Sequence, residues 1–410
     1  MKPYDFTDMM VPTAQYDLIL KNGRVIDAAL GLDDILDVAV ANGKIAAVAK
    51  GITGPCPDVV DCTGKLVIPG FVDAHLHCYP ATHIGLGPES GGIYNGVPTV
   101  VDAGSAGYMT FPDFYHRYIT RSATDIYALL HLHPLGLHAN EPECWDKDVL
   151  KIQTYRIIET VAEYPDRIIG IKNRALEGFL LHKGLAGLDE LLRLCDRCGL
   201  PLTLHIGDFF SERLSDAEVD GFTRGALERL RPGDILAHAF TGKRGKLFRE
   251  DGGFEPLIQK AVERGVLLDA CVGQTNFSVA SLRMALERGF KPFLISSDYG
   301  CVSMDGVNQN FGLNISRFLT VGLSLQEILA MTTINPARAM RLDDRKGSLR
   351  TGREADISVL DLAGGEYSFM DHGGGELFTG TEMISPAFVV RKGIVYHVIH
   401  KGYQEPEKKA

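Results

Sequence analysis

The sequence lacks an uninterrupted apolar run of about twenty residues, the length that an α-helix needs to cross a bilayer. Its opening residues, MKPYDFTDMMVPTAQ, also lack the basic flank and the apolar block of a secretory signal. We therefore expect no membrane span and a cytoplasmic protein.

The sequence also lacks an excess of positive charge. Lys and Arg number 42 against 52 Asp and Glu, which gives a formal net charge of -10. Nucleic-acid binding draws much of its affinity from clustered Lys and Arg, and the one dense basic stretch, residues 241–250, is short enough to be a solvated loop. We expect a small-molecule substrate and no nucleic-acid partner; a homo-oligomer is compatible with the sequence.

Cysteines are few and scattered, eight in 410 residues, so a disulfide framework is not indicated and we expect free thiols. Cys195 and Cys198 form a CxxC pair. It lies in a stretch with helical spacing, and no second CxxC completes a zinc site. Helix packing is the favoured interpretation of this pair.

Short alternating strands fill residues 16–66, and Asn-Gly pairs at 22–23 and 42–43 are strong hairpin signals. A similar β pattern returns near the C-terminus. Because 410 residues exceed what one hydrophobic core usually supports, we expect more than one domain. Residues 1–66 and 346–410 are predicted to form one small discontinuous β-sandwich.

The central part, residues 67–345, has a different pattern of apolar strand-like runs, most of them followed by an amphipathic helical stretch. The eight runs are residues 66–76, 97–104, 126–132, 167–173, 200–207, 234–240, 265–272 and 291–298. Parallel strands buried on both faces read as continuous apolar runs. Eight such units predict a (β/α)8 TIM barrel.

Two His-x-His pairs end apolar runs, His75 with His77 in VIPGFVDAHLHCYP and His131 with His133 in IYALLHLHPLG. Active sites of this fold lie at the C-terminal ends of the strands. Residues two apart on a strand point to the same face, so either pair could share a metal ion. The pattern alone does not choose between the pairs.

Four later runs carry a metal-capable side chain at or near their ends: Lys172, His205, His238 and Asp298. Together with the first pair, five strands then offer candidate ligands at comparable heights. A lysine inside an apolar strand needs a partner, because Lys is almost never fully buried alone. Its neutral amine can add carbon dioxide to form a carbamate, an anionic ligand that can bridge two divalent ions.

These residues together resemble the amidohydrolase superfamily of metal-dependent hydrolases. The resemblance rests on PGFVDAHLH, on the Lys, His, His and Asp that follow in the same order, on NPAR at 335–338 and on the stretch 347–359. Residues 96–114 and 231–245 are similar to a branch labelled amidohydrolase/deacetylase, which is often called dihydroorotase-like. The match covers nearly the whole chain.

The resemblance implies two divalent ions, zinc being the first choice, although manganese and iron suit the same ligand types. One ion would bind His75, His77 and Asp298. The other would bind His205 and His238, with carboxylated Lys172 bridging both. His131 and His133 match no ligand position, which favours a structural or supporting role.

Four further residues are expected to contact substrate. Arg174 should face the same way as Lys172 and could hold a substrate carboxylate, or pair with a loop acid. In CVGQTNFS, which departs from the GHG-type pattern of the branch, Gly273, Gln274 and Asn276 are expected to line the pocket.

The reaction implied is hydrolysis of an amide or ester, with Asp298 moving the proton between water and leaving group. The deacetylase branch implies an O-acetyl 2-hydroxy acid or an N-acetyl amino acid as substrate. Cys78 and Tyr79 follow His77 where dihydroorotases usually carry an arginine, which counts against that label. A cyclic amidohydrolase, a deaminase and a non-catalytic scaffold are the alternatives.

Overall fold

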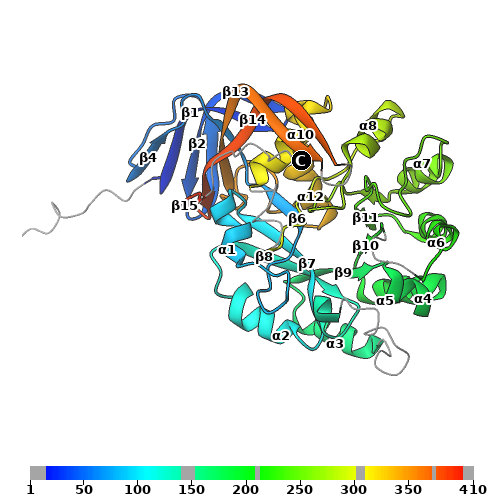
Figure 1. Ribbon diagram of the computed structural model, residues 1–410. Helices are drawn as coiled ribbons and strands as arrows, with labels where there is room; N and C mark the ends of the chain where they lie inside the picture. The colour runs from blue at the N-terminus through cyan, green and yellow to red at the C-terminus, as the bar shows by residue number, and fades with distance from the viewer. Residues whose placement is uncertain (1–14, 140–152, 208–212, 302–309, 372–374, 400–410) are drawn as a thin grey trace, which may run out of the picture.

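The computed structural model describes residues 15–139, 153–207, 213–301, 310–371 and 375–399, which form two sheets and the helices around them (Figure 1). The first sheet has seven parallel strands. In order they are β6 (Val72–Leu76), β7 (Thr99–Gly107), β8 (Asp125–His131), β9 (Ile168–Arg174), β10 (Leu202–His205), β11 (Ile235–Ala237) and β12 (Leu267–Leu268). Each strand pairs with its sequence neighbour.

An eighth segment closes this sheet into a barrel. Parallel bridges join Leu294 to Asp269 on one side and Tyr299 to Leu76 on the other, so residues 294–299 lie between β12 and β6. The backbone hydrogen bond from Asp298 N to His75 O, 2.7 Å long, belongs to the same seam. The predicted TIM barrel is confirmed.

Helices follow most barrel strands and pack their apolar sides against them. They are α1 (Pro88–Gly91), α2 (Phe111–Phe114), α3 (Thr154–Glu163), α4 (Glu177–His182), α5 (Gly184–Cys198), α6 (Asp216–Arg229), α7 (Glu255–Arg264), α8 (Val279–Glu287), α10 (Phe311–Thr320), α11 (Leu325–Thr332) and α12 (Ile334–Ala339). Short 3-10 or π turns are η2 (Ile93–Asn95), η3 (Tyr115–Ile119) and η4 (Gly136–Ala139). Leu188, Leu191 and Cys195 of α5 are buried at helical spacing, as the sequence predicted for the CxxC stretch.

The second sheet joins the two ends of the chain, and Figure 1 shows blue β1 and β2 beside orange β13 and β14. Its eight strands are β1 (Leu18–Asp27), β2 (Leu32–Ala41), β3 (Lys44–Ala49), β4 (Asp58–Asp61), β5 (Leu66–Pro69), β13 (Ile357–Asp371), β14 (Glu376–Arg391) and β15 (Ile394–His397). β13 pairs antiparallel with β5, so residues far apart in sequence share one core. A separate β unit built from both ends is therefore present.

Two local predictions were wrong. Residues 66–76 are not one barrel strand: β5 pairs with β1 and β13, and β6 pairs with β7. The Asn22-Gly23 pair is not a hairpin turn but a bulge inside β1, where the amide of Asn22 donates to Asp37 Oδ1 at 2.9 Å. Asn22 has φ 60°, so the left-handed residue that a hairpin needs serves a bulge here.

The Asn42-Gly43 hairpin is present between β2 and β3. The division into segments 1–66, 67–345 and 346–410 stays a prediction. Within the described ranges, no helix has both the length and the apolar character needed to span a bilayer.

Candidate metal centre

Lys172 lies in the middle of the barrel mouth, near the end of β9. Its side chain is fully buried, and its Nζ lies 3.0 Å from His75 Nε2. Gly104, with φ +84°, packs against it, since a Cβ there would lie 2.7 Å from Lys172 Cγ. Burial lowers the pKa of Lys172 to about 8, while the charges of Cys271 and Asp298 act in the opposite direction.

His75 and His77 both turn into the mouth, as strand alternation predicts. The two Nε2 atoms lie 3.4 and 3.2 Å, respectively, from the same atom, Asp298 Oδ1. His77 Nδ1 lies 3.1 Å from Ser105 Oγ, which fixes the orientation of the ring. Burial and the charge of Lys172 lower the pKa of His75, so its imidazole is neutral.

His205 ends β10 and His238 follows β11, with ring centroids 4.1 Å apart. The His238 ring also lies 5.3 Å from that of His75. His238 Nδ1 donates to the carbonyl oxygen of Cys271 at 2.9 Å, which leaves Nε2 directed at Asp298 Oδ2, 3.9 Å away. Burial lowers the pKa of His238 to about 4, so it too is neutral, as a metal ligand must be.

Asp298 meets these histidines from the closing segment. Its backbone has φ 53°, and Asn276 Nδ2 donates to its Oδ2 at 3.3 Å. A Cβ at Gly273 would lie 2.5 Å from that oxygen, so only glycine lets the loop approach so closely. Burial acts to raise the pKa of Asp298, but the hydrogen bond with His77 and the nearby His238 and Lys172 hold it below its ordinary value.

Two buried carboxylates behind the histidines were missed from the sequence. Asp73 Oδ1 accepts from the amides of His75 at 3.2 Å and Ser297 at 3.0 Å. Asp269 accepts from Ser296 Oγ at 2.7 Å and lies 3.9 Å from His75 Nδ1. Burial raises the pKa of both acids to about 7. Asp73 stands two residues before His75, so strand alternation was the available signal.

Cys271 is a third residue of the site that was not predicted from the sequence. Its Sγ lies 3.0 Å from His75 Nδ1 and 3.6 Å from His238 Nε2. His75, His238, Cys271 and Asp298 each offer a ligand atom, and these atoms all lie within 4.8 Å of one another. Buried imidazoles, a carboxylate and a thiol are the donors that Zn²⁺ prefers, so this group fits a divalent ion.

The second His-x-His pair is turned differently. His131 pairs in register with Lys172, yet its Nδ1 accepts from the amide of His133 at 2.9 Å. His133 Nδ1 accepts in turn from the amide of Leu135 at 3.1 Å. Backbone contacts thus occupy one nitrogen of each ring.

Arg174 ends β9, in register with His205. It is half-buried; burial lowers the pKa values of His131 and His205, and the charge of Arg174 adds to this effect. Burial lowers the pKa of Arg174 itself, with Asp298 opposing this. It thus belongs to the electrostatic environment of the mouth.

Another acidic group, Asp125, Glu354 and Asp356, has the spacing of a metal site but surrounds a lysine. Lys346 Nζ lies 2.7, 2.8 and 2.5 Å from their carboxylate oxygens, respectively. The ammonium group takes the place that an ion would occupy.

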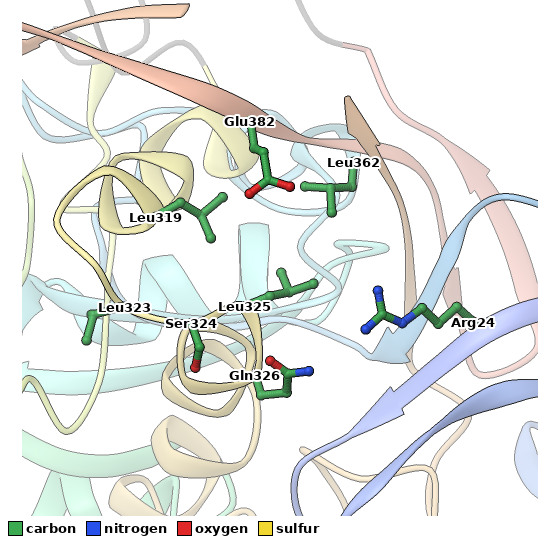
Figure 2. A pocket seen from close by; sticks show the side chains of 8 residues that line it. All are labelled: Arg24, Leu319, Leu323, Ser324, Leu325, Gln326, Leu362 and Glu382. Carbon is green, nitrogen blue, oxygen red and sulfur yellow. The ribbon is translucent and has the colours of Figure 1, made fainter. Parts of the chain in front are cut away.

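A cavity of about 320 Å³ lies between α10, α11 and the second sheet (Figure 2). Its cation, Arg24, is already bound to Asp33, and Gln326 donates to the same carboxylate. This cavity is separate from the metal-capable residues. A much smaller cavity, about 10 Å³, is lined by residues that include Gly273 and Gln274. Gly273 packs against Asp298, so this cavity lies next to the candidate metal centre.

Comparison with known proteins gives consistent results. Residues 158–404 match the amidohydrolase family, and residues 58–118 match a second pattern of the same description. Deacetylase Atu3266 of Agrobacterium fabrum is 32% identical over 337 residues, which are 81% of this chain and 80% of the relative. A deacetylase of Enterococcus faecalis is 27% identical over 93% of this chain and 99% of its own length.

Among solved structures, an adenine deaminase superposes with a TM-score of 0.84 at 26% identity, covering 93% of this chain and all of its own. A dihydroorotase superposes with a TM-score of 0.82 at 28% identity, covering 94% and 100%, respectively.

Proposed function

The chain belongs to the amidohydrolase family and is a hydrolase, and from that premise we propose that it uses two divalent ions to remove an acetyl group from a small carboxylic acid. The observation that carries the proposal is the meeting of six metal-capable side chains from five barrel segments. They are His75, His77, Lys172, His205, His238 and Asp298.

We assign His75, His77 and Asp298 to one ion and His205 and His238 to the other. Zinc is the preferred metal. Such ions, when bound, activate water for attack on a carbonyl carbon and polarise the carbonyl oxygen. The neutral imidazoles and the ionised carboxylate described above support this assignment, because these are the forms that bind metal.

Lys172 is assigned as a carboxylated ligand between the two ions. Its low pKa supports this, because the neutral amine is the form that adds carbon dioxide. The position of its Nζ, 3.0 Å from His75 Nε2 inside a fully buried site, also supports it, because a buried ammonium needs a compensating negative charge. The carbamate would turn a buried cation into an anionic ligand.

Asp298 is assigned as the proton carrier. It accepts the proton of the attacking water and returns it to the leaving oxygen or nitrogen as the carbon–heteroatom bond breaks. Asn276 fixes one of its carboxylate oxygens, and Gly273 leaves space beside it. Arg174 is assigned to hold the substrate carboxylate at the rim.

Acetylated acids, O-acetyl 2-hydroxy acids or N-acetyl amino acids, are favoured over ring substrates for two reasons. The relatives with long aligned stretches at 27% and 32% identity are named deacetylases. The position where dihydroorotases usually carry a substrate arginine holds Cys78, which is fully buried and whose amide binds Asp102. Hydrolysis would take place in the cytoplasm.

A metal analysis followed by a substrate screen tests the proposal. Purified enzyme loaded with zinc should contain two ions per chain and release acetate from members of an N-acetyl and O-acetyl acid panel. Ammonia released from purines, or ring opening of hydantoin-like substrates, would instead establish the deaminase or cyclic amidohydrolase alternative. A protein that binds no metal and hydrolyses nothing in the panels would be a scaffold.

A further inference from the structure

Cys271 occupies a place in the barrel mouth that the proposed function does not use. It lies two residues after Asp269 at the end of the β12 segment, and its amide donates to Asp269 Oδ1 at 3.0 Å. The residue is fully buried and has φ 39°. Its backbone therefore bends at the point where its sulfur meets the histidines.

The surroundings of this sulfur differ from those of the other buried thiols in the described ranges. Cys62, Cys78 and Cys195 each belong to an apolar core cluster, where cysteine acts as a small hydrophobic residue. Cys271 belongs to no such cluster and contacts imidazole nitrogens of His75 and His238. Core packing does not account for it.

Two distances among the donors are close to those around a tetrahedral ion. Bonds of about 2.0–2.3 Å place neighbouring ligand atoms roughly 3.3–3.8 Å apart. Cys271 Sγ lies 3.6 Å from His238 Nε2, and His238 Nε2 lies 3.9 Å from Asp298 Oδ2. The ring of His75 faces Cys271 Sγ through Nδ1 at 3.0 Å and Asp298 Oδ1 through Nε2 at 3.4 Å, and one of these two nitrogens can bind the same ion as the sulfur.

We propose that Cys271 is a thiolate ligand of the metal centre, beside His75, His238 and Asp298. The proposal rests on the proposed function for the presence of an ion. Binding transfers the thiol proton to solvent as the sulfur–metal bond forms, so loading releases one proton more than it does from a protein without the thiol. A sulfur ligand favours Zn²⁺ and Co²⁺ over Mn²⁺ and Mg²⁺.

Cobalt substitution tests this directly, because a thiolate bound to Co²⁺ gives an intense charge-transfer band in the near ultraviolet. The full-length enzyme loaded with Co²⁺ should show the band. Cys271→Ser should lose it at the same cobalt content and bind Zn²⁺ roughly tenfold or more weakly, with a smaller change for Mn²⁺. Cys195→Ser, which removes a thiol buried in a helix, should keep the band.

Cobalt-loaded wild-type enzyme with full metal content and no such band would overturn the proposal, even if acetate were still released. A band that disappears only in Cys271→Ser would support it, even if no acetylated acid were hydrolysed. The spectrum of the wild-type enzyme decides the matter if the serine variant fails to fold.

Discussion

Two of the candidate ligand rings, those of His77 and His238, contact a protein group through Nδ1 and direct Nε2 toward Asp298. Ser105 holds His77 through Nδ1, and the carbonyl of Cys271 holds His238 through Nδ1. Such partners fix the tautomer and the direction of a ligand ring. The residues are therefore aligned before any ion binds.

The first prediction concerns the proton carrier. Asp298→Asn keeps an oxygen for the metal but cannot take a proton, so turnover should fall about a hundred- to ten-thousandfold while metal is retained. Elemental analysis and initial rates on an acetylated acid measure the two effects. Full activity in this variant would remove Asp298 from the proton-transfer role.

The second prediction concerns the bridge. Lys172→Ala removes the nitrogen that is proposed to carry the carbamate, so the protein should lose most of its metal and its activity. Acetate or formate added to the buffer should restore part of both by supplying a carboxylate. An unchanged metal content in the alanine variant would contradict the bridging assignment.

At this scale, alternation along a strand pointed to His75 and His77, whereas Lys172, His205, His238 and Asp298 were predicted from their positions at or near the ends of apolar runs and from the family resemblance. Asp269 and Cys271 are also two residues apart, the spacing that alternation requires. Cys271 was nevertheless not predicted, because its backbone has a positive φ, and the residue types of LLDACV do not reveal this conformation.

At the scale of elements, three strand ends bend the same way. His238, Cys271 and Asp298 all have positive φ, with values of 61°, 39° and 53°, respectively. Left-handed non-glycine residues cost about 1–3 kcal/mol each and persist where surrounding contacts impose them. In this protein, the positive φ values turn these three side chains into the barrel mouth, a direction that regular strand geometry would not give them.

The third prediction concerns Gly104 in β7. An alanine there would meet Lys172 Cγ at 2.7 Å and would hold φ +84°. Gly104→Ala should therefore displace Lys172 and lower metal content. Gly31→Ala is the matched control, because Gly31 has φ +63° with nothing within 4 Å of a Cβ.

In the control, left-handed strain alone should lower the free energy of unfolding by about 1–2 kcal/mol without loss of metal. Chemical denaturation and elemental analysis of both variants separate strain from displacement. Equal metal content in the two variants would show that Gly104 has no role in placing Lys172.

The number and order of the barrel strands could be predicted because buried parallel strands leave long apolar runs. The boundary between β5 and β6 could not, since Gly70 lies inside such a run and only pairing with β13 separates the two strands. The Asn22 bulge was missed for a similar reason: a bulge and a hairpin use the same left-handed residue.

At the scale of the whole molecule, Lys346 joins the barrel to the second sheet. Its ammonium contacts Asp125 at the start of β8 and Glu354 and Asp356 just before β13. The lysine side chain is 1% exposed, and Arg391 also lies 3.3 Å from Asp125 Oδ1, so these buried charges compensate one another.

The fourth prediction follows from this burial. Lys346→Met leaves the carboxylates without their central cation and should lower the free energy of unfolding by about 3–5 kcal/mol. Lys50→Met removes the ion pair of Lys50 with Asp34, whose side chains are 69% and 49% exposed, respectively. It should lower the free energy of unfolding by less than about 1 kcal/mol. Urea denaturation compares the two; similar losses would refute the buried role.

The fifth prediction is the pH dependence of the same group. Burial acts to raise the pKa of Asp125, but Lys346 and Arg391 hold it below its ordinary value. Stability from a depressed carboxyl pKa is present above the unfolded pKa and lost as pH falls through the folded one. The stability that Lys346→Met removes should therefore be largest near neutral pH and shrink in acid, as urea denaturation of both proteins at several pH values would measure; a difference that does not change with pH would argue against the coupling.

The sequence predicted that the two ends of the chain would share one β unit, because both have alternating strands. It did not predict how far that unit reaches. The long strand β13 ends at Asp371, whose Oδ2 accepts from the amide of Val279 at 2.8 Å, at the first turn of α8.

Through this hydrogen bond, the C-terminal strand β13 supports a loop of the barrel mouth. The loop it fastens carries Cys271, Gly273 and Asn276, so shortening the chain before β13 would release this loop along with the strand. An engineered barrel without its terminal segments would keep every proposed ligand in its sequence and still lose the frame that aims several of them.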